Sequence, residues 1–263
     1  MGDTTTYETK TMKLKDILSP SFNSIRRPPT DSLPLWTARL SSKSSFCRAV
    51  VQAGLLSHRQ MVRAALRYRL GQSKDDAVIY WQIDQLGVVH DGKLMWYGAD
   101  CHRLKQRRPT WVSHLFKKQY GLPDDAFQSV HCFFGLHLLR SLHSGRDCKT
   151  VALVEAEKSA VILSERYPQY TWLAAGGLSE VQPYKFWPLR HHKVVIFPDT
   201  DETGETFKTW SDIAQQASKL YFFQYPLRVS TILELHATPD QKSRKIDLVD
   251  FLFESKDYKK IIL

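Results

Sequence analysis

The sequence predicts an α/β protein in which a mostly parallel β-sheet is flanked by helices. Two short apolar runs rich in β-branched residues carry this prediction, VALV at 151–154 and VVIFP at 194–198. Such runs are typical of strands that are buried on both faces of a parallel sheet. The first run ends on Glu155, and the second leads into Asp199 and Asp201. Because open α/β sheets bind ligands at the carboxyl ends of their strands, we expect these carboxylates to share one functional edge.

The remaining patterns place smaller elements before this sheet. Residues 1 to about 35 carry Thr, Ser and Pro clusters and predict an extended arm. Two regions rich in secondary-structure signals follow, the first helical and the second β-rich. We therefore expect three segments: an arm and two helices at 1–72, a small β-rich subdomain with a basic loop at 73–145, and the α/β domain at 146–263.

Two N-terminal helices are expected before residue 72. The first runs from Ser44 to Ala53, ahead of a glycine, and the second runs from Ser57, a predicted N-cap, to about Leu70. On the second helix, arginines recur every four residues and form one basic stripe. This stripe is either a solvated face or a contact for phosphate groups, and it consists of Arg59, Arg63 and Arg67.

Residues 77–97 change to short β-rich runs, which predict an antiparallel meander. Gly87 and the dipeptide Asp91-Gly92 are expected to make its turns. A basic loop, HRLKQRRP, and a short helix that ends at Gly121 come next. The segment FFGLHLLRSLH at 133–143 has apolar residues at helical spacing.

Within the α/β domain, a helix over AEKSAVILSERY is expected after the first strand, followed by a strand at TWLA. The second acidic run is followed by a predicted helix from Thr203 to about Leu220, and LRVSTILEL predicts a further strand. The chain closes with DLVDFLF, a predicted helix that starts at Asp247. Asp247 is expected either to cap this helix or to take part in a metal site.

The composition favours a nucleic-acid partner. The chain has 37 Lys and Arg against 27 Asp and Glu, a formal net charge of +10. Such an excess favours polyanions, because neutralised phosphates release counterions, although a basic surface alone has the same composition. The four cysteines form no C-x-x-C pair, which argues against a disulfide framework or zinc ribbon and fits a cytoplasmic protein. No run is long enough to predict a membrane span.

The paired motifs VALVEAEKSA and VVIFPDTDETG resemble the toprim domain of bacterial primases, topoisomerases and small nucleases. The acidic positions match one by one as Glu155, Asp199 and Asp201. The resemblance implies that the aspartates hold Mg²⁺ or Mn²⁺, and that Glu155 is a further ligand or the general acid/base. Asp247 lies in a segment similar to the acidic end of primase-type toprim domains. Ala156 departs from the pattern, since many relatives have glycine there.

The order of the preceding segments is also similar to bacterial primases and to uncharacterised toprim-like proteins of mobile elements. The chain lacks a zinc-binding module and the G-x-x-x-x-G-K-[ST] loop of a helicase, which excludes a replicative primase-helicase. Three hypotheses follow: primase-like nucleotidyl transfer on a single-stranded template, a toprim nuclease of DNA or RNA, and a non-catalytic nucleic-acid-binding module. The cations expected to contact nucleic acid are Lys158, Arg59, Arg63, Arg67, Lys93, Arg103, Lys105, Arg107 and Arg108.

Overall fold

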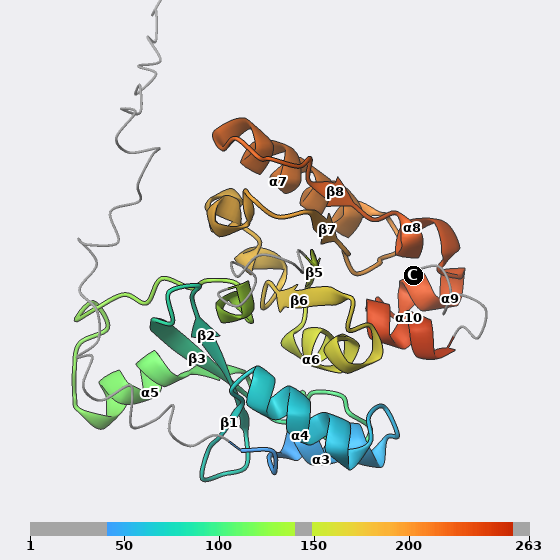
Figure 1. Cartoon of the computed structure of the whole chain (residues 1–263). Helices are drawn as coiled ribbons and strands as arrows, with labels where there is room; N and C mark the ends of the chain where they lie inside the picture. Colours follow the sequence, from blue (N-terminus) through green and yellow to red (C-terminus); the bar gives the residue numbers. More distant parts are fainter. Residues whose placement is uncertain (1–40, 140–148, 255–263) are drawn as a thin grey trace, which may run out of the picture.

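The computed structural model describes residues 41–139 and 149–254 (Figure 1). The predicted N-terminal arm therefore lies outside the described residues. Two four-stranded sheets form the molecule, one antiparallel and one parallel. In the described part of the chain, no helix has the length and apolar character needed to cross a membrane.

The parallel sheet has the strand order β6-β5-β7-β8. Every neighbouring pair in it is parallel, as the buried apolar runs predict. Helices cover both of its faces (Figure 1), so the predicted α/β class is confirmed. The strands are β5 (Thr150–Val154), β6 (Tyr170–Ala174), β7 (Val194–Ile196) and β8 (Arg228–Val229).

Alternation along β5 separates two hydrophobic cores, one on each face of the parallel sheet; a third core lies in the antiparallel sheet around Ile79, Trp81 and Leu94. Ala152 and Val154 belong to the first core, whereas Val151 and Leu153 belong to the second. Successive residues of a strand point to opposite faces of the sheet. All four side chains are buried, because helices cover both faces. The first core contains α3 (Ser45–Gln52), α4 (His58–Arg67), α6 (Glu157–Arg166) and α10 (Leu248–Glu254), and the second contains η3 (Pro183–Leu189) and α7 (Glu205–Leu220).

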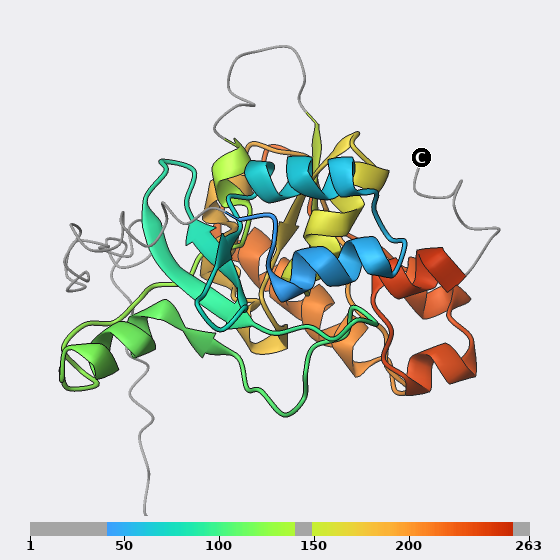
Figure 2. The ribbon, with the colours of Figure 1, turned by 90° about the horizontal axis from the view of Figure 1, so that it is seen from below.

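The two N-terminal helices begin where the sequence predicts. The Ser44 side chain accepts a hydrogen bond from Cys47 N at the start of α3, and Ser57 forms a capping box with Gln60 at the start of α4. Helix α4 packs on α6, and α3 packs beside α4 (Figure 2). Together they cover one face of the parallel sheet.

The antiparallel sheet, in the order β1-β2-β3-β4, differs from the predicted meander in one turn. Strand β3 runs straight through Asp91-Gly92, with Gly92 opposite Trp81, so the turn predicted there is wrong. The glycine is needed for packing, since a Cβ at this position would lie 2.7 Å from two ring atoms of Trp81. The chain turns instead at Asp84–Gly87, where Gly87 N donates to Asp84 O. The strands are β1 (Gly71–Gln72), β2 (Val78–Ile83), β3 (Val89–Met95) and β4 (Thr110–Trp111).

Two other predicted elements are shorter than their patterns suggest. Phe134 forms a β-bridge with Ala174, and only a 3-10 turn follows it, so no α-helix begins at residue 133; residues 140–148 of that prediction lie outside the described chain. In LRVSTILEL, only Arg228 and Val229 pair with the sheet before a helix begins. The remaining short elements are α5 (Val112–Gln119), η2 (Leu178–Glu180), α8 (Ile232–His236) and α9 (Pro239–Ser243).

Candidate metal and nucleic-acid site

Three carboxyl groups near the carboxyl end of the parallel sheet, those of Glu155, Asp199 and Asp250, have pKa values raised by burial and by neighbouring carboxylates. Glu155 directly follows β5 and Asp199 comes shortly after β7, and these two strands are hydrogen-bonded neighbours. Burial raises the pKa of Asp199 well above its ordinary value, and the charges of Asp247 and Glu155 raise it further. Asp250 adds to the same effect. The sequence-predicted residues Glu155, Asp199 and Asp247 are therefore within electrostatic reach of one another.

Opposing influences act on the pKa of Glu155 at this edge of the sheet. Burial raises the pKa of Glu155, and the charge of Lys93 and a hydrogen bond from the Leu178 backbone lower it, with a net increase. The negative charge of Asp247 also raises this pKa. A carboxylate with a raised proton affinity among other carboxylates is a group that a cation would stabilise.

Asp247 both caps a helix and belongs to the acidic cluster. Its Oδ1 accepts a hydrogen bond from Asp250 N at 2.9 Å, and its Oδ2 accepts one from Ser159 Oγ at 2.7 Å. The Lys158 ammonium lies 3.4 Å from Asp247 Oδ2 and 3.8 Å from Asp250 Oδ1. Burial lowers the pKa of Lys158, but these two aspartates outweigh burial and raise it. Lys158 thus neutralises part of the cluster from within.

Asp201 is engaged differently from Asp199. Its Oδ1 accepts from Thr203 N at 2.8 Å and Thr203 Oγ1 at 2.7 Å, and its Oδ2 accepts from Thr206 N at 2.7 Å. Burial would raise the pKa of Asp201, but hydrogen bonds from Thr206 and Thr203 hold it far below its ordinary value. Asp201 therefore stabilises the start of α7. Its pKa is lowered by these hydrogen bonds, whereas the pKa of Asp199 is raised by burial and by neighbouring carboxylates.

The predicted ligands Glu155, Asp199, Asp201 and Asp247 do not form a three-ligand metal site in the described part of the chain. Among the described residues, no group of three His, Cys, Asp or Glu side chains is arranged to hold a metal ion. Mg²⁺ keeps several waters and takes only one or two protein carboxylates, so a site for this ion does not require three protein ligands. The buried Thr200 Oγ1 lies between the two motif aspartates in sequence and lacks a hydrogen-bond partner in the described structure. A hydrated ion would offer this hydroxyl a partner.

Ala156 fits the backbone of the first motif. It forms the N-cap of α6 with φ −92° and ψ 140°, an extended conformation that alanine adopts without strain. The departure from glycine therefore imposes no backbone penalty at this position.

Lys93 has a role other than the predicted phosphate contact. Its ammonium donates to Gly176 O at 2.6 Å and lies 3.2 Å from Glu157 Oε1. The side chains of Lys93 and Glu157 are only 12% and 3% exposed, so this pair is internal. It joins β3 of the antiparallel sheet to the start of α6, beside Glu155. Lys93 therefore has no exposed charge with which to contact nucleic acid.

The arginine stripe of α4 is mostly committed to the fold. Arg63 and Arg67 both pair with Glu165, whose side chain is 2% exposed, at 2.5 and 2.9 Å. Arg67 also donates to Ser164 O and Oγ. All three arginines are exposed, with side-chain exposures of 52% for Arg63 and 38% for Arg67. The sequence left open a solvated face or a phosphate contact; the structure shows a third arrangement for Arg63 and Arg67, since their ion pairs with Glu165 join α4 to α6.

The basic loop lies beside the acidic cluster. A cleft of ≈ 640 Å³ is lined on one side by His102, Arg103 and Lys105, and on the other by Arg244 and Asp250. The four predicted cations of this loop are all exposed. Arg107 is engaged by Asp75 at 3.0 Å and by the Trp96 ring at 5.0 Å. Within residues 41–139 and 149–254, no ion pair occupies Arg103, Lys105 or Arg108.

Residues 44–200, more than half of the sequence, match the family model described as "Domain of unknown function (DUF6371)". The chain belongs to the DUF6371 family. The matched part of this DUF6371 protein includes Glu155 and Asp199 and ends before Asp201 and the α10 segment. None of the curated proteins matches the sequence significantly.

Several solved structures of primases are similar to this DUF6371 chain. The primase fragment of the bacteriophage T7 primase-helicase protein has 13% identity and a TM-score of 0.45, covering 76% of this chain and 69% of that chain. The E. coli primase catalytic core has 13% identity and a TM-score of 0.48, with coverages of 87% and 82%. The DnaG primase catalytic domain bound to ssDNA has 14% identity and a TM-score of 0.43, with coverages of 86% and 82%.

One acidic member of the cluster was not among the site residues predicted from the sequence of this DUF6371 protein. Asp250 raises the pKa of Asp199 and lines the cleft below the basic loop. Its spacing of three residues from Asp247 is the available signal, because residues three apart lie on one face of a helix.

Proposed function

We propose that this protein catalyses metal-dependent phosphoryl transfer on nucleic acid, of the primase-like nucleotidyl-transfer type. One observation carries the proposal: the pKa values of Glu155, Asp199 and Asp250 are raised near the carboxyl end of a parallel sheet, by burial and by neighbouring carboxylates that include Asp247. Such groupings of perturbed carboxyls at a strand edge are characteristic of functional sites. The toprim-like motifs around Glu155 and Asp199 support the same assignment.

Each residue has a distinct task in this proposal. Asp199 and Glu155 would hold Mg²⁺ or Mn²⁺, since the other two carboxylates are engaged by a helix start or by Lys158. The ion, when bound, supplies charge neutralisation for the phosphoryl oxygens. Glu155, with its raised pKa, can accept or return the proton of the attacking hydroxyl. Lys158 limits the repulsion between Asp247 and Asp250, and so keeps the site assembled.

The cleft beside the site supplies the place for the substrate. Asp250 lies on the cleft wall opposite the cations Arg103 and Lys105. Burial and Asp247 raise the pKa of Asp250, whereas Lys158 and, across the cleft, His102 lower it. A nucleic-acid backbone held by the basic loop would thus pass next to the carboxylates. The predicted phosphate contacts of Arg103, Lys105 and Arg108 belong to this proposal, together with Arg59 on α4.

A direct test uses labelled nucleotides with a single-stranded template, run in parallel with cleavage of single- and double-stranded DNA and RNA. Wild type is expected to extend or synthesise primers with Mg²⁺ or Mn²⁺, and Asp199→Asn is expected to lose this activity with an intact fold. Asp212→Asn, the same change at an exposed position of α7, is the matched control. Cleavage products without synthesis would assign the site to a nuclease, and binding without either reaction would overturn the catalytic proposal.

A further inference from the structure

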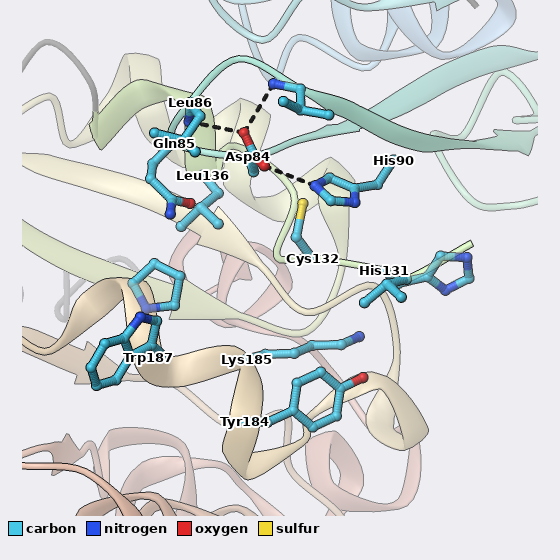
Figure 3. A pocket seen from close by; sticks show the side chains of 13 residues that line it. Asp84, Gln85, Leu86, His90, His131, Cys132, Leu136, Tyr184, Lys185 and Trp187 are labelled. Carbon is cyan, nitrogen blue, oxygen red and sulfur yellow. Dashed lines mark hydrogen bonds and ion pairs between the residues drawn. The ribbon is translucent and has the colours of Figure 1, made fainter. Parts of the chain in front are cut away.

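A small pocket opens between the β2–β3 turn and η3, and none of the acidic-cluster residues lines it (Figure 3). Its volume is ≈ 250 Å³, and Tyr184, Lys185 and Trp187 of η3 line one side. The Lys185 ammonium is paired with Glu180 at 2.5 Å, so this wall carries little free charge. Tyr184 and Trp187 remain 42% and 38% exposed, although both are large and apolar. The rings therefore offer a surface to something outside this chain.

The exposed rings continue from the pocket along one surface. Trp187 packs against Tyr221 at a centroid separation of 5.2 Å, and the Arg190 guanidinium lies 3.7 Å from the Trp187 centroid. Gln224 N donates to Arg190 O at 2.8 Å, which joins the loop after α7 to the segment before β7. We call this surface the aromatic ridge; it comprises Tyr184, Trp187, Arg190, Lys193 and Tyr225, together with the exposed Phe222, which follows Tyr221 in the sequence.

Rings and cations alternate on the aromatic ridge. Phe222 is 87% exposed, and the Lys193 ammonium lies 5.4 Å from the Tyr225 centroid. The segments 184–198 and 213–233 contain no Asp or Glu, so no acidic residue within them offsets the cations. The aromatic ridge also precedes β7 and β8, whereas Glu155 and Asp199 follow their strands. Lys193 and Tyr225, just before these strands, therefore lie at the opposite end of the parallel sheet from Glu155 and Asp199.

We propose that the aromatic ridge binds the unpaired bases of a single-stranded nucleic acid and that the pocket receives one base. Base–aromatic stacking uses exposed ring faces without regard to sequence, and neighbouring cations neutralise the phosphates. An acidic peptide could pair with the cations, but its carboxylates would not stack on the exposed aromatic rings. The pocket is smaller than the about 300–1,000 Å³ of sites for drug-sized ligands, which suits a single ring system. This binding requires no metal ion and is separate from the proposed catalysis.

The binding is measured as fluorescence anisotropy of a labelled oligothymidylate of about 12 nucleotides, a typical length for single-strand sites. The buffer contains EDTA, so that metal chemistry plays no part. Phe222→Ala is expected to weaken binding by about fivefold or more, the lower range for loss of one stacked base. Trp187→Ala should do the same, and Trp187→Phe should restore much of the affinity. Phe253→Ala, which removes an exposed ring beside Arg166, should leave the affinity unchanged.

Three comparisons complete the test. An abasic oligomer of equal length should bind far more weakly than oligothymidylate, and an acidic peptide should fail to compete. Replacement of Arg190 and Lys193 by Gln should lower the salt dependence of log Kd by about one unit per lost phosphate contact. Equal affinity for the abasic oligomer, displacement by the peptide, or full affinity in Phe222→Ala and Trp187→Ala would overturn the proposal.

The aromatic ridge and the acidic cluster can fail separately. Asp199→Asn should retain the ridge-dependent binding even though it lacks phosphoryl transfer. Ridge-dependent binding in a catalytically silent wild type would reject the proposed function alone. Catalysis that persists without ridge-dependent binding would reject the aromatic ridge alone.

Discussion

Replacement of Lys93 by Met tests the internal ion pair that joins the antiparallel sheet to the candidate site. Methionine keeps the length of the side chain and removes its charge. Glu157, whose side chain is 3% exposed, then keeps a carboxylate without its partner, and Gly176 O loses its donor at 2.6 Å. Loss of one member of a buried ion pair destabilises proteins by about 3–5 kcal/mol. Because a domain is typically stable by about 5–15 kcal/mol, we expect a large fraction of the total stability to be lost.

Urea unfolding, followed by tryptophan fluorescence, measures this effect as a change in the free energy of unfolding at constant m-value. The double variant Lys93→Met with Glu157→Gln should recover part of the loss, since the buried position no longer holds an unpaired charge. Arg48→Met is the surface control: Arg48 and its partner Asp76 have side chains 59% and 38% exposed, and such pairs contribute about 0–1 kcal/mol. A loss in Lys93→Met no greater than in Arg48→Met would refute the buried-pair argument.

Two further predictions concern the antiparallel sheet and its neighbours. Burial would lower the pKa of His131, but hydrogen bonds to Asp91 and Glu180 outweigh it and raise the pKa. Its stabilising contribution should therefore be complete below about pH 6.5 and be lost as the pH rises through the raised value, so urea midpoints at pH 6 and pH 8.5 should differ less in His131→Gln than in wild type. Gly92→Ala places a Cβ 2.7 Å from Trp81 ring atoms and should destabilise the protein by about 1–3 kcal/mol, measured by urea unfolding; an unchanged midpoint would mean that the ring moves freely.

Local sequence patterns correctly predicted the elements that depend on residues close together in the sequence. Ser57 forms the predicted N-cap of α4, and the run before Glu155 forms a strand buried on both faces. Patterns failed where a distant partner decides the outcome. Gly92 has the composition of a turn, yet it makes room for Trp81 on the neighbouring strand. In LRVSTILEL, pairing ends after Val229, since β7 supplies only a short partner strand.

The candidate site shows the same division. Spacing in the sequence correctly brings Glu155 and Asp199 to neighbouring strands, because parallel strands end at a common edge. It does not reveal which charges are already neutralised within the fold. The partners of Lys93 and Arg63 are 64 and 102 residues away in sequence, and both were expected to contact nucleic acid. Charge alone could not separate these paired cations from the unpaired ones that the structure describes in the basic loop.

Three helices begin beside the acidic cluster: α6 directly after Glu155, α7 at the loop held by Asp201, and α10 at Asp247. The amino end of each helix carries a partial positive charge of about half an elementary charge from its aligned peptide dipoles. The backbone itself thus supplies a permanent counter-field to the clustered carboxylates. As a consequence, the fold itself offsets part of the repulsion among the clustered carboxylates.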